Sequence, residues 1–389
     1  MTDLQETEIT AQEPKAPLAG RVMSIDALRG FDMFWIIGGW YIFDGLHKAL
    51  NNTTTGFIMK QLKHVEWEGF VFEDLIMPLF LFIVGVVMPF SFNKRLERGD
   101  SKWKLYVHVL MRSIILFILG MMAQGDLLKL DPSKLKIFCN TLQAIAAGYL
   151  ISAIIILNMR LRWQIVTTVL LLLLFWALMM LVPFPGRVAD RLNQDANLAA
   201  YIDWYILGPF DDGLNYTWIL SSMTFACTVM LGVFAGHLLS SKIDNYRKVY
   251  ILAALGIGTL VIGSLWGGWF FGIGKFYFGL FPIIKRLWTS SFVIFAAGLS
   301  YILLAAFYLV IDVWGLKKWA YGFVVIGTNA IFVYMLTHLI NFRSVVPGFV
   351  GGLDRFAGPW KDFIHAVAGF ALVWLILFWM YRKKTFIKV

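Results

Sequence analysis

Long apolar runs separated by short polar segments are the main pattern along this chain. A run of about 20 mostly apolar residues is long enough to cross the hydrocarbon core of a bilayer as a helix. The pattern predicts an all-α, polytopic membrane protein, a single bundle of about ten transmembrane helices. The predicted spans lie near residues 30–48, 72–92, 106–124, 140–158, 164–183, 217–239, 249–271, 290–312, 319–340 and 363–381.

The composition supports a membrane class and divides the chain into two parts. Hydrophobic residues make up 59% of the sequence and charged residues only 15%, with a mean hydropathy of +0.71. A soluble domain typically has about a quarter charged residues. Residues 1–20 are polar and acidic and lack the apolar core of a signal peptide, so we expect a short disordered tail. Residues 21–389 form the predicted transmembrane domain.

The positive charge is unevenly distributed between the two sets of loops. The net charge is +10, which in a soluble protein can indicate nucleic-acid binding, but no nucleic-acid motif occurs here. Lys and Arg are instead dense in short segments that an even number of spans places on one side: 93–104, 158–162, 240–248, 315–319 and 381–389. The positive-inside rule therefore predicts that both termini are cytoplasmic. We expect membrane lipid, and no nucleic acid, among the partners.

The first polar cluster lies at the cytoplasmic mouth of the first span. The segment SIDALRGFD contains Asp26, Arg29 and Asp32. Asp26 and Arg29 are three residues apart, so they can meet on one helical face. Two interpretations stay open: a structural ion pair at the helix end, or a phosphate-binding arginine that an aspartate orients.

The second cluster precedes the second span on the outer side. The segment KHVEWEGFVFEDLIMP holds His64, then Glu66 and Glu68, and finally Glu73 and Asp74. Acids in a first helical turn interact favourably with the helix dipole, which is a sufficient reason for Glu73 and Asp74. His64 is different, because histidine is a frequent general base and a carboxylate can orient it.

The third cluster places hydrogen-bonding groups at or inside two later spans. Ser290 and Ser291 lie in KRLWTSSF (285–292), and Asn329 and His338 lie in GTNAIFVYMLTHLIN (327–341). Bonds between helices are the simpler interpretation of each residue. Asn329 and His338 are nine residues apart, so they share a helical face that could line a buried cavity. No His-x-x-His spacing occurs, and Cys139 and Cys227 are expected to be packing residues, so we expect no metal site.

These clusters, in this order, resemble the transmembrane acyltransferase family that includes heparan-α-glucosaminide N-acetyltransferase, a lysosomal enzyme. The likeness runs from RVMSIDALRGF through KHVEWEGFVFEDLIMPLFLFIVGV, RSIILFILGMM, YIDWYILG, RLWTSSF and YLVIDVWGL to GTNAIFVYMLTH. Each motif is weak alone, but the ordered set is specific. The chain lacks the family enzyme's additional N-terminal region and first span, which favours a bacterial homologue in the inner (cytoplasmic) membrane.

The resemblance implies a reaction and roles for particular residues. Acetyl-CoA would donate from the cytosol, and the amine of a glucosamine-type sugar or glycan would accept on the outer side, with a homodimer as the expected assembly. The family's catalytic histidine falls on His64, and we predict Asp74 and Asn329 as further catalytic residues. The predicted acetyl-CoA site comprises Asp26, Arg29, Trp288, Ser290, Ser291 and His338.

Several alternatives stay open at this point. Direct attack by the amine and transfer through acetyl-His64 fit equally well. Ala144 stands where the family often has an arginine, and PFDDGLNYTW replaces its Asp-Pro-Glu-Gly segment. A different kind of acceptor, a glycan hydroxyl or a lipid-linked sugar, is therefore an alternative. An amino-sugar transporter is the chief rival, because buried polar residues serve transport as well as catalysis.

Overall fold

The computed structural model describes residues 22–185, 190–213, 216–270, 274–275 and 279–387, so the predicted tail at 1–20 lies outside the described residues. The long helices are α4 (Phe72–Glu97), α5 (Lys102–Gln124), α6 (Thr141–Asn158), α7 (Leu161–Leu181), α9 (Ser222–Ser240), α10 (Asn245–Gly267), α11 (Ser290–Tyr308) and α17 (Lys361–Arg382). The shorter helices are α1 (Met23–Phe34), α2 (Trp40–Leu50), α3 (Thr53–Gln61), α8 (Leu198–Leu207), α12 (Tyr321–Gly327), α13 (Ala330–Leu339), α14 (Phe342–Val345), α15 (Pro347–Val350) and α16 (Asp354–Ala357).

Short irregular elements complete the fold. Two π-helical turns, η1 (Trp35–Gly39) and η4 (Leu309–Val313), extend α1 and α11. The 3₁₀ turns are η2 (Leu127–Lys129), η3 (Gly208–Phe210), η5 (Gly351–Leu353) and η6 (Gly358–Trp360). The two-residue strands β1 (Trp269–Phe270) and β2 (Gly274–Lys275) pair antiparallel.

The predicted membrane class is confirmed. Among the described residues, eight helical segments are long and apolar enough to cross a bilayer, and α12 with α13 makes a ninth if this pair, bent by 74°, counts as one span. The prediction of a span at 30–48 differs from the structure. The helix already begins at Met23, and Gly38, with a φ of 131°, interrupts it, so α1 and α2 run in different directions.

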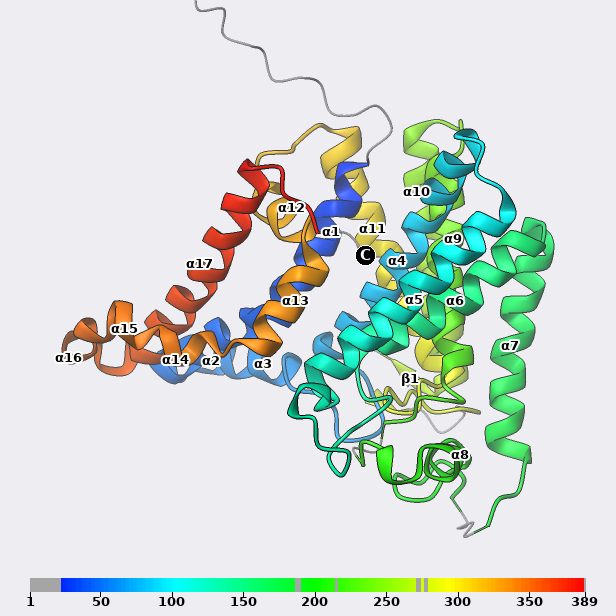
Figure 1. Cartoon of the computed structure of the whole chain (residues 1–389), viewed down its shortest axis with the longest axis horizontal. Coiled ribbons are helices and arrows are strands. Elements are labelled where there is room, and N and C mark those ends of the chain that lie inside the picture. The colour runs from blue at the N-terminus through cyan, green and yellow to red at the C-terminus, as the bar shows by residue number, and fades with distance from the viewer. Residues whose placement is uncertain (1–21, 186–189, 214–215, 271–273, 276–278, 388–389) are drawn as a thin grey trace, which may run out of the picture.

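The helices form two groups (Figure 1). Helices α4 to α7 and α9 to α11 make the larger group, in which α4 packs against α9 and α10 against α11. Helices α1, α12, α13 and α17 make the smaller group, and α2, α3 and α14 to α16 lie across its lower end in the view. Helix α1 contacts both α12 and α11, so it joins the two groups.

Close backbone contact fixes α1 against α12. A Cβ atom added at Gly30 would overlap the carbonyl group of Phe323, and one at Gly327 would overlap the carbonyl oxygen of Asp26. Small residues of this kind let helices approach closely in membrane proteins. The two glycines therefore set the position of the segment that carries Asp26 and Arg29.

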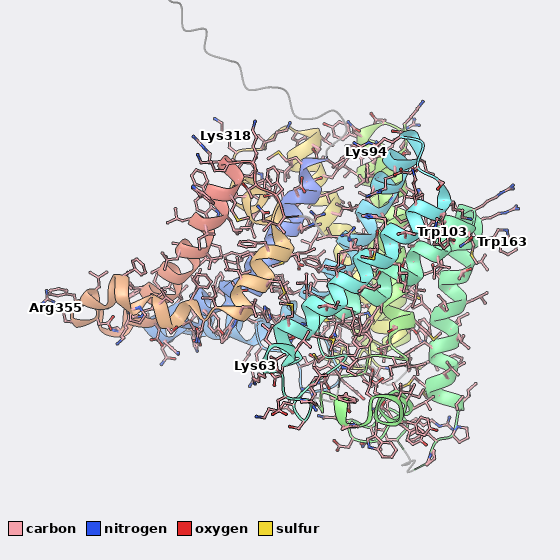
Figure 2. All side chains as sticks on the ribbon, viewed as in Figure 1. Lys63, Lys94, Trp103, Trp163, Lys318 and Arg355 are labelled. Atoms are coloured by element: carbon pink, nitrogen blue, oxygen red, sulfur yellow. The ribbon has the colours of Figure 1, made fainter. Side chains whose placement is uncertain are left out.

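Residues in or beside three of the basic segments predicted for one side lie toward one end of the molecule. Lys94, Trp103, Trp163 and Lys318 lie toward the upper end in Figure 2, whereas Lys63 lies toward the lower end. Trp103 and Trp163 are 75% and 53% exposed, as expected of tryptophans that anchor helices at a membrane interface. Loops far apart in the sequence thus share one end, and their location in the cytoplasm stays a prediction.

Candidate active site

Two loops that are distant in the sequence meet at the lower end of the larger helix group. The backbone N–H of Gly69 donates to the carbonyl oxygen of Ile283 at 2.9 Å, and Glu68 and Ile284 form an isolated antiparallel bridge. This pairing joins the loop before α4 to the loop before α11. It brings His64 from the first loop next to Lys285 from the second.

Asp74 is held by the start of α4. Its Oδ2 accepts the backbone N–H of Val71 at 3.2 Å, which caps the helix, and its Oδ1 lies 2.8 Å from Nδ1 of His64. The Asp74 side chain is 1% exposed and the His64 side chain 47% exposed. The carboxylate is therefore a buried anchor, while the imidazole ring reaches toward the surface.

Lys285 is the third member of this group. Its Nζ lies 3.4 Å from Oδ1 of Asp74 and 3.2 Å from Nδ1 of His64, and it donates to the carbonyl oxygen of Glu73 at 3.5 Å. The Lys285 side chain is 7% exposed. Burial lowers the pKa of Lys285, whereas the neighbouring carboxylates of Asp74 and Glu73 act in the opposite direction.

These contacts determine the tautomer of His64. An ammonium group has donors only, and a carboxylate has acceptors only. Lys285 and Asp74 both find hydrogen-bond partners when Nδ1–H of His64 donates to Asp74 and Lys285 donates to the same carboxylate. Nε2 of His64 is then the lone-pair nitrogen. A half-exposed imidazole in this tautomer can accept a proton from a group that approaches from the loop side.

The predicted residues around the start of α11 are buried and hydrogen-bonded within the bundle. Ser290 donates to the carbonyl oxygen of Leu172 at 2.7 Å, and Ser291 donates to that of Pro282 at 3.0 Å. The indole N–H of Trp288 donates to the hydroxyl of Thr228 at 3.0 Å. These bonds hold the loop that carries Lys285, and a role in acetyl-CoA binding stays a prediction.

Asp26 and Arg29 form the ion pair that their spacing predicts. Nη1 of Arg29 lies 3.5 Å from Oδ1 of Asp26, and the two side chains are 23% and 12% exposed. The carboxylate of Asp312 accepts the backbone N–H groups of Met23 and Ser24 at 3.2 and 2.9 Å, so it caps α1. This cluster lies at the end of α1 that faces the basic loops (Figure 1).

The side chains of Asn329 and His338 both contact main-chain groups of the protein. Asn329, at the break between α12 and α13, donates to the carbonyl oxygen of Thr385 at 3.2 Å and accepts the N–H of Ile387 at 3.0 Å. Nδ1 of His338 lies 2.8 Å from the carbonyl oxygen of Tyr334, and the two rings stack. The structure thus ties Asn329 to the C-terminal segment, and its catalytic role stays a prediction.

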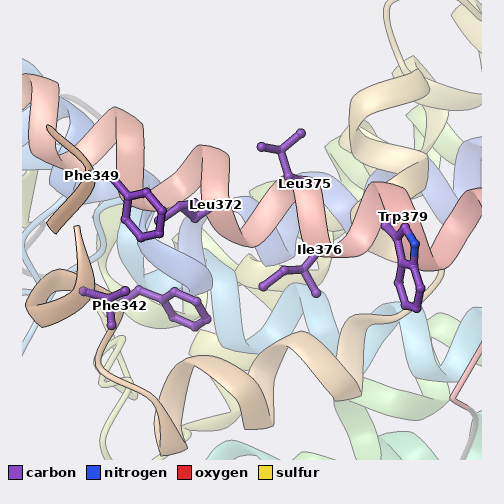
Figure 3. A pocket seen from close by; sticks show the side chains of 7 residues that line it. Phe342, Phe349, Leu372, Leu375, Ile376 and Trp379 are labelled. Carbon is purple, nitrogen blue, oxygen red and sulfur yellow. The ribbon is translucent and has the colours of Figure 1, made fainter.

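Two surface hollows lie apart from the His64 group. One is lined by the apolar side chains of α14, α15 and α17 drawn in Figure 3: Phe342, Val345, Phe349, Leu372, Leu375, Ile376 and Trp379. The other contains Arg343, Asp44, Lys48 and Asp362, with Nζ of Lys48 between the two carboxylates at 3.0 and 2.8 Å. The first holds no group able to transfer a proton, and the charges of the second largely pair with one another.

Sequence reasoning missed Lys285. The residue falls inside the segment KRLWTSSF that was singled out for its serines. The signal was a lysine followed by an arginine between apolar residues at the mouth of a span, where an unpaired charge is costly. What the sequence does not reveal is its partner, because Lys285 and His64 are 221 residues apart.

Comparison with models of known protein families finds no match. Heparan-alpha-glucosaminide N-acetyltransferase of Mus musculus is 24% identical over an alignment that covers 97% of this chain, and that of Homo sapiens is 25% identical over 96% of it. The chain spans about three fifths of the length of these relatives, 62% and 60% respectively. Because the likeness covers nearly the whole chain, this membrane protein is distantly related to the heparan-alpha-glucosaminide N-acetyltransferases.

Proposed function

We propose that this protein is a membrane acetyltransferase in which His64 acts as the general base. The proposal assigns acetyl-CoA as the donor and the amino group of a glucosamine-type sugar as the acceptor. The observation that carries it is the buried Asp74 carboxylate 2.8 Å from Nδ1 of a half-exposed His64, with Lys285 beside both. The distant relationship to N-acetyltransferases supports the same reaction class.

The proposed reaction begins with a proton transfer to His64. Nε2 of His64 takes a proton from the acceptor ammonium, and the free amine attacks the thioester carbonyl. The carbon–sulfur bond breaks, and the thiolate takes up the second proton that the new amide loses. Asp74 stabilises the imidazolium during this step, and Lys285 keeps Asp74 charged. One proton per turnover then leaves His64 through its exposed face.

The donor would enter from the opposite end of the bundle. Arg29 lies in the middle of α1, one turn after Asp26 in the first turn, and a guanidinium group is well suited to bind the phosphates of CoA. Asp26 lies 3.5 Å away and orients it. Sidedness follows from the positive-inside rule, which places these groups in the cytoplasm and His64 on the outer side. A homodimer is a further expectation from the family resemblance.

The test uses purified protein in detergent with isotopically labelled acetyl-CoA and glucosamine. We expect labelled N-acetylglucosamine from the wild type and a loss of at least about 100-fold with His64→Ala. His365→Ala is the matched control, because His365 also contacts an aspartate, Asp354, at 2.6 Å, but in the surface segment near α16. Unchanged transfer by His64→Ala would rule out the proposal.

A second assay separates the two chemical routes and the nature of the acceptor. Labelled acetyl-CoA without acceptor should leave stoichiometric label on His64 only if an acetyl-enzyme forms. A parallel screen of amines, glycan hydroxyls and lipid-linked sugars identifies the accepting atom. Transfer to hydroxyls alone would keep the acyltransferase and overturn the amino-sugar acceptor.

One feature favours a transporter as the second candidate. Helices α12 and α13 are bent by 74° at Asn329, and interrupted helices frequently form the solute sites of transporters. Uptake of labelled glucosamine into proteoliposomes without acetyl-CoA would support this function. Acetylation by detergent-solubilised protein, in the absence of any compartment, would instead support the enzyme.

A further inference from the structure

Asp32 is a buried carboxyl group that the chemistry proposed for His64 leaves without a role. It lies on α1, its relative exposure is 0%, and in the part of the chain that the structure describes neither of its oxygens has a hydrogen-bond partner. Burying a polar group without a partner costs free energy, and an isolated charge costs far more. A fully buried carboxyl group without a hydrogen-bond partner is a candidate for binding a ligand.

Two further buried polar atoms near Asp32 are also unsatisfied among the described residues. They are Oε2 of Glu73 and the indole Nε1 of Trp35. Trp35 follows Asp32 by three residues, so both side chains emerge on one face of the α1 segment. Glu73 belongs to the first turn of α4 and immediately precedes Asp74.

Aromatic contacts bring these two helices together at this level. The ring of Phe72 lies 5.0 Å from that of Trp35 and 6.4 Å from that of Phe31. Asp32 therefore lies between two residues that contact the residue just before Glu73. The carboxyl groups of Asp32 and Glu73 are also close enough to interact electrostatically. Asp32, Trp35 and Glu73 therefore belong to the region where α1 meets the start of α4, next in the chain to Asp74.

The nearest cations already have nearer partners. The ammonium of Lys285 acts on Glu73 electrostatically, but it lies 3.4 Å from Asp74 and bonds only the main chain of Glu73. The guanidinium of Arg29 faces Asp26. Two buried carboxyl groups that influence each other electrostatically gain most from a ligand that carries its own positive charge.

The unsatisfied atoms define the chemistry of that guest. Three carboxyl oxygens need donors, the indole N–H needs an acceptor, and aromatic faces attract cations. A protonated amine that also bears a hydroxyl matches this set. A divalent metal matches it poorly, because Ca²⁺ takes six to eight oxygens and Mg²⁺ demands octahedral geometry.

We propose that Asp32, Glu73 and Trp35 form a subsite for the ammonium group and a neighbouring hydroxyl of a protonated amino sugar. The inference rests on the proposed function, in which the acceptor amine must come within reach of His64, and it deepens that function by assigning specificity. Asp74 anchors His64, and Glu73 precedes Asp74 on the same helical turn. In this proposal, the ammonium is bound by Glu73 and Asp32 while it still carries the proton that His64 removes.

The test measures binding without acetyl-CoA, so it does not depend on catalysis. Calorimetry on the detergent-purified full chain should show saturable binding of glucosamine, with much weaker binding of N-acetylglucosamine and glucose, which lack the ammonium. Asp32→Asn and Glu73→Gln are nearly isosteric and uncharged. Each should raise the Kd for glucosamine at least about tenfold. Asp44→Asn is the matched control, because the Asp44 carboxylate already pairs with the ammonium of Lys48 at 3.0 Å.

A variant-free measurement covers the case in which a substituted protein does not fold. Ethanolamine should compete with glucosamine for the wild type, whereas ethylene glycol should not. Full affinity in both Asp32→Asn and Glu73→Gln, or displacement of glucosamine by sodium but not by ethanolamine, would overturn the subsite. Intact glucosamine binding without any acetyl transfer would overturn the proposed function and leave the subsite standing.

Discussion

Nδ1 of His64 lies 2.8 Å from Oδ1 of Asp74, although the histidine is 47% exposed and the aspartate 1% exposed. A second pair, His365 with Asp354, is just as close at 2.6 Å, but there the aspartate is 30% exposed. Distance alone therefore does not distinguish the two pairs. Burial of the carboxylate does, because electrostatic interactions are stronger where water is excluded.

Replacing Asp74 with Asn should separate these two pairs in function. The amide keeps the shape of the side chain but removes the charge that stabilises a protonated His64. We expect kcat for acetyl transfer to fall at least about 100-fold. Asp354→Asn, which alters the exposed pair, should leave kcat within about twofold. Equal effects of the two substitutions in a steady-state assay would contradict this distinction.

Lys285 and Asp74 should depend on each other for stability. Lys285→Met leaves a buried carboxylate without its cation, which costs about 3–5 kcal/mol in comparable buried pairs. The double variant Lys285→Met/Asp74→Asn removes both charges and should regain part of the lost thermal stability, but not the activity. Unfolding temperatures in detergent check this, and additive losses would show that the two groups do not interact.

Activity should fall at alkaline pH through Lys285. Because burial lowers the pKa of Lys285, this side chain loses its charge at a lower pH than an ordinary lysine, whose pKa is near 10.4. When Lys285 becomes neutral, the Asp74 carboxylate loses the positive charge beside it, so kcat should decline. Lys285→Arg keeps the charge at all accessible pH values and should remove the decline. An unaltered pH–rate profile in folded Lys285→Arg would assign the decline to another group.

Close packing of α1 and α12 should be sensitive to a single methyl group. Gly327→Ala places a Cβ against the carbonyl oxygen of Asp26, so we expect a lower unfolding temperature and weaker acetyl-CoA binding. Gly258→Ala is the control, since a Cβ at that position of α10 meets nothing within 4 Å and favours the helix. A Gly327→Ala protein as stable as Gly258→Ala would mean that the helices separate without cost.

Asn329 should protect the C-terminal segment from proteolysis. Its amide makes two hydrogen bonds to the backbone of Thr385 and Ile387, just beyond the exposed Lys383 and Lys384. Asn329→Ala should therefore increase the rate of trypsin cleavage after these lysines, measured by mass spectrometry. Asn341→Ala, which removes a cap of α14, serves as the control. Equal cleavage rates would show that the segment is held by other contacts.

The sequence predicted most helices because their signal is local. Nine of the ten predicted spans correspond to helical segments among the described residues, counting the bent α12–α13 pair as one. The exception is the span predicted at 30–48, which is interrupted at Gly38; the Gly38–Gly39 pair is a turn signal that the apolar run around it outweighed. The bend at Asn329 was missed for the same reason: the hydropathy of the run continues through it.

The candidate site was predictable in part. The local pattern pointed to His64, whereas Asp74, ten residues later at a helix start, was explained by the helix dipole and became a candidate only through the family resemblance. The ion pair of Asp26 and Arg29 also follows from helical spacing. By contrast, the Asn329 side chain binds residues more than fifty positions away, a relationship that spacing along one helix does not contain.

The sequence by itself determined the membrane class and most of the helical segments, and it singled out His64 as a candidate base. These properties depend on runs of side chains and on neighbours within a few turns. Tertiary structure alone decided that Lys285 meets His64 and Asp74, and that Asp32 lies near Glu73 without a hydrogen-bonding partner among the described residues. The physical reason is that both arrangements depend on backbone pairing and helix packing between segments far apart in the chain. Burial in these contacts then sets the strength of the electrostatic interactions.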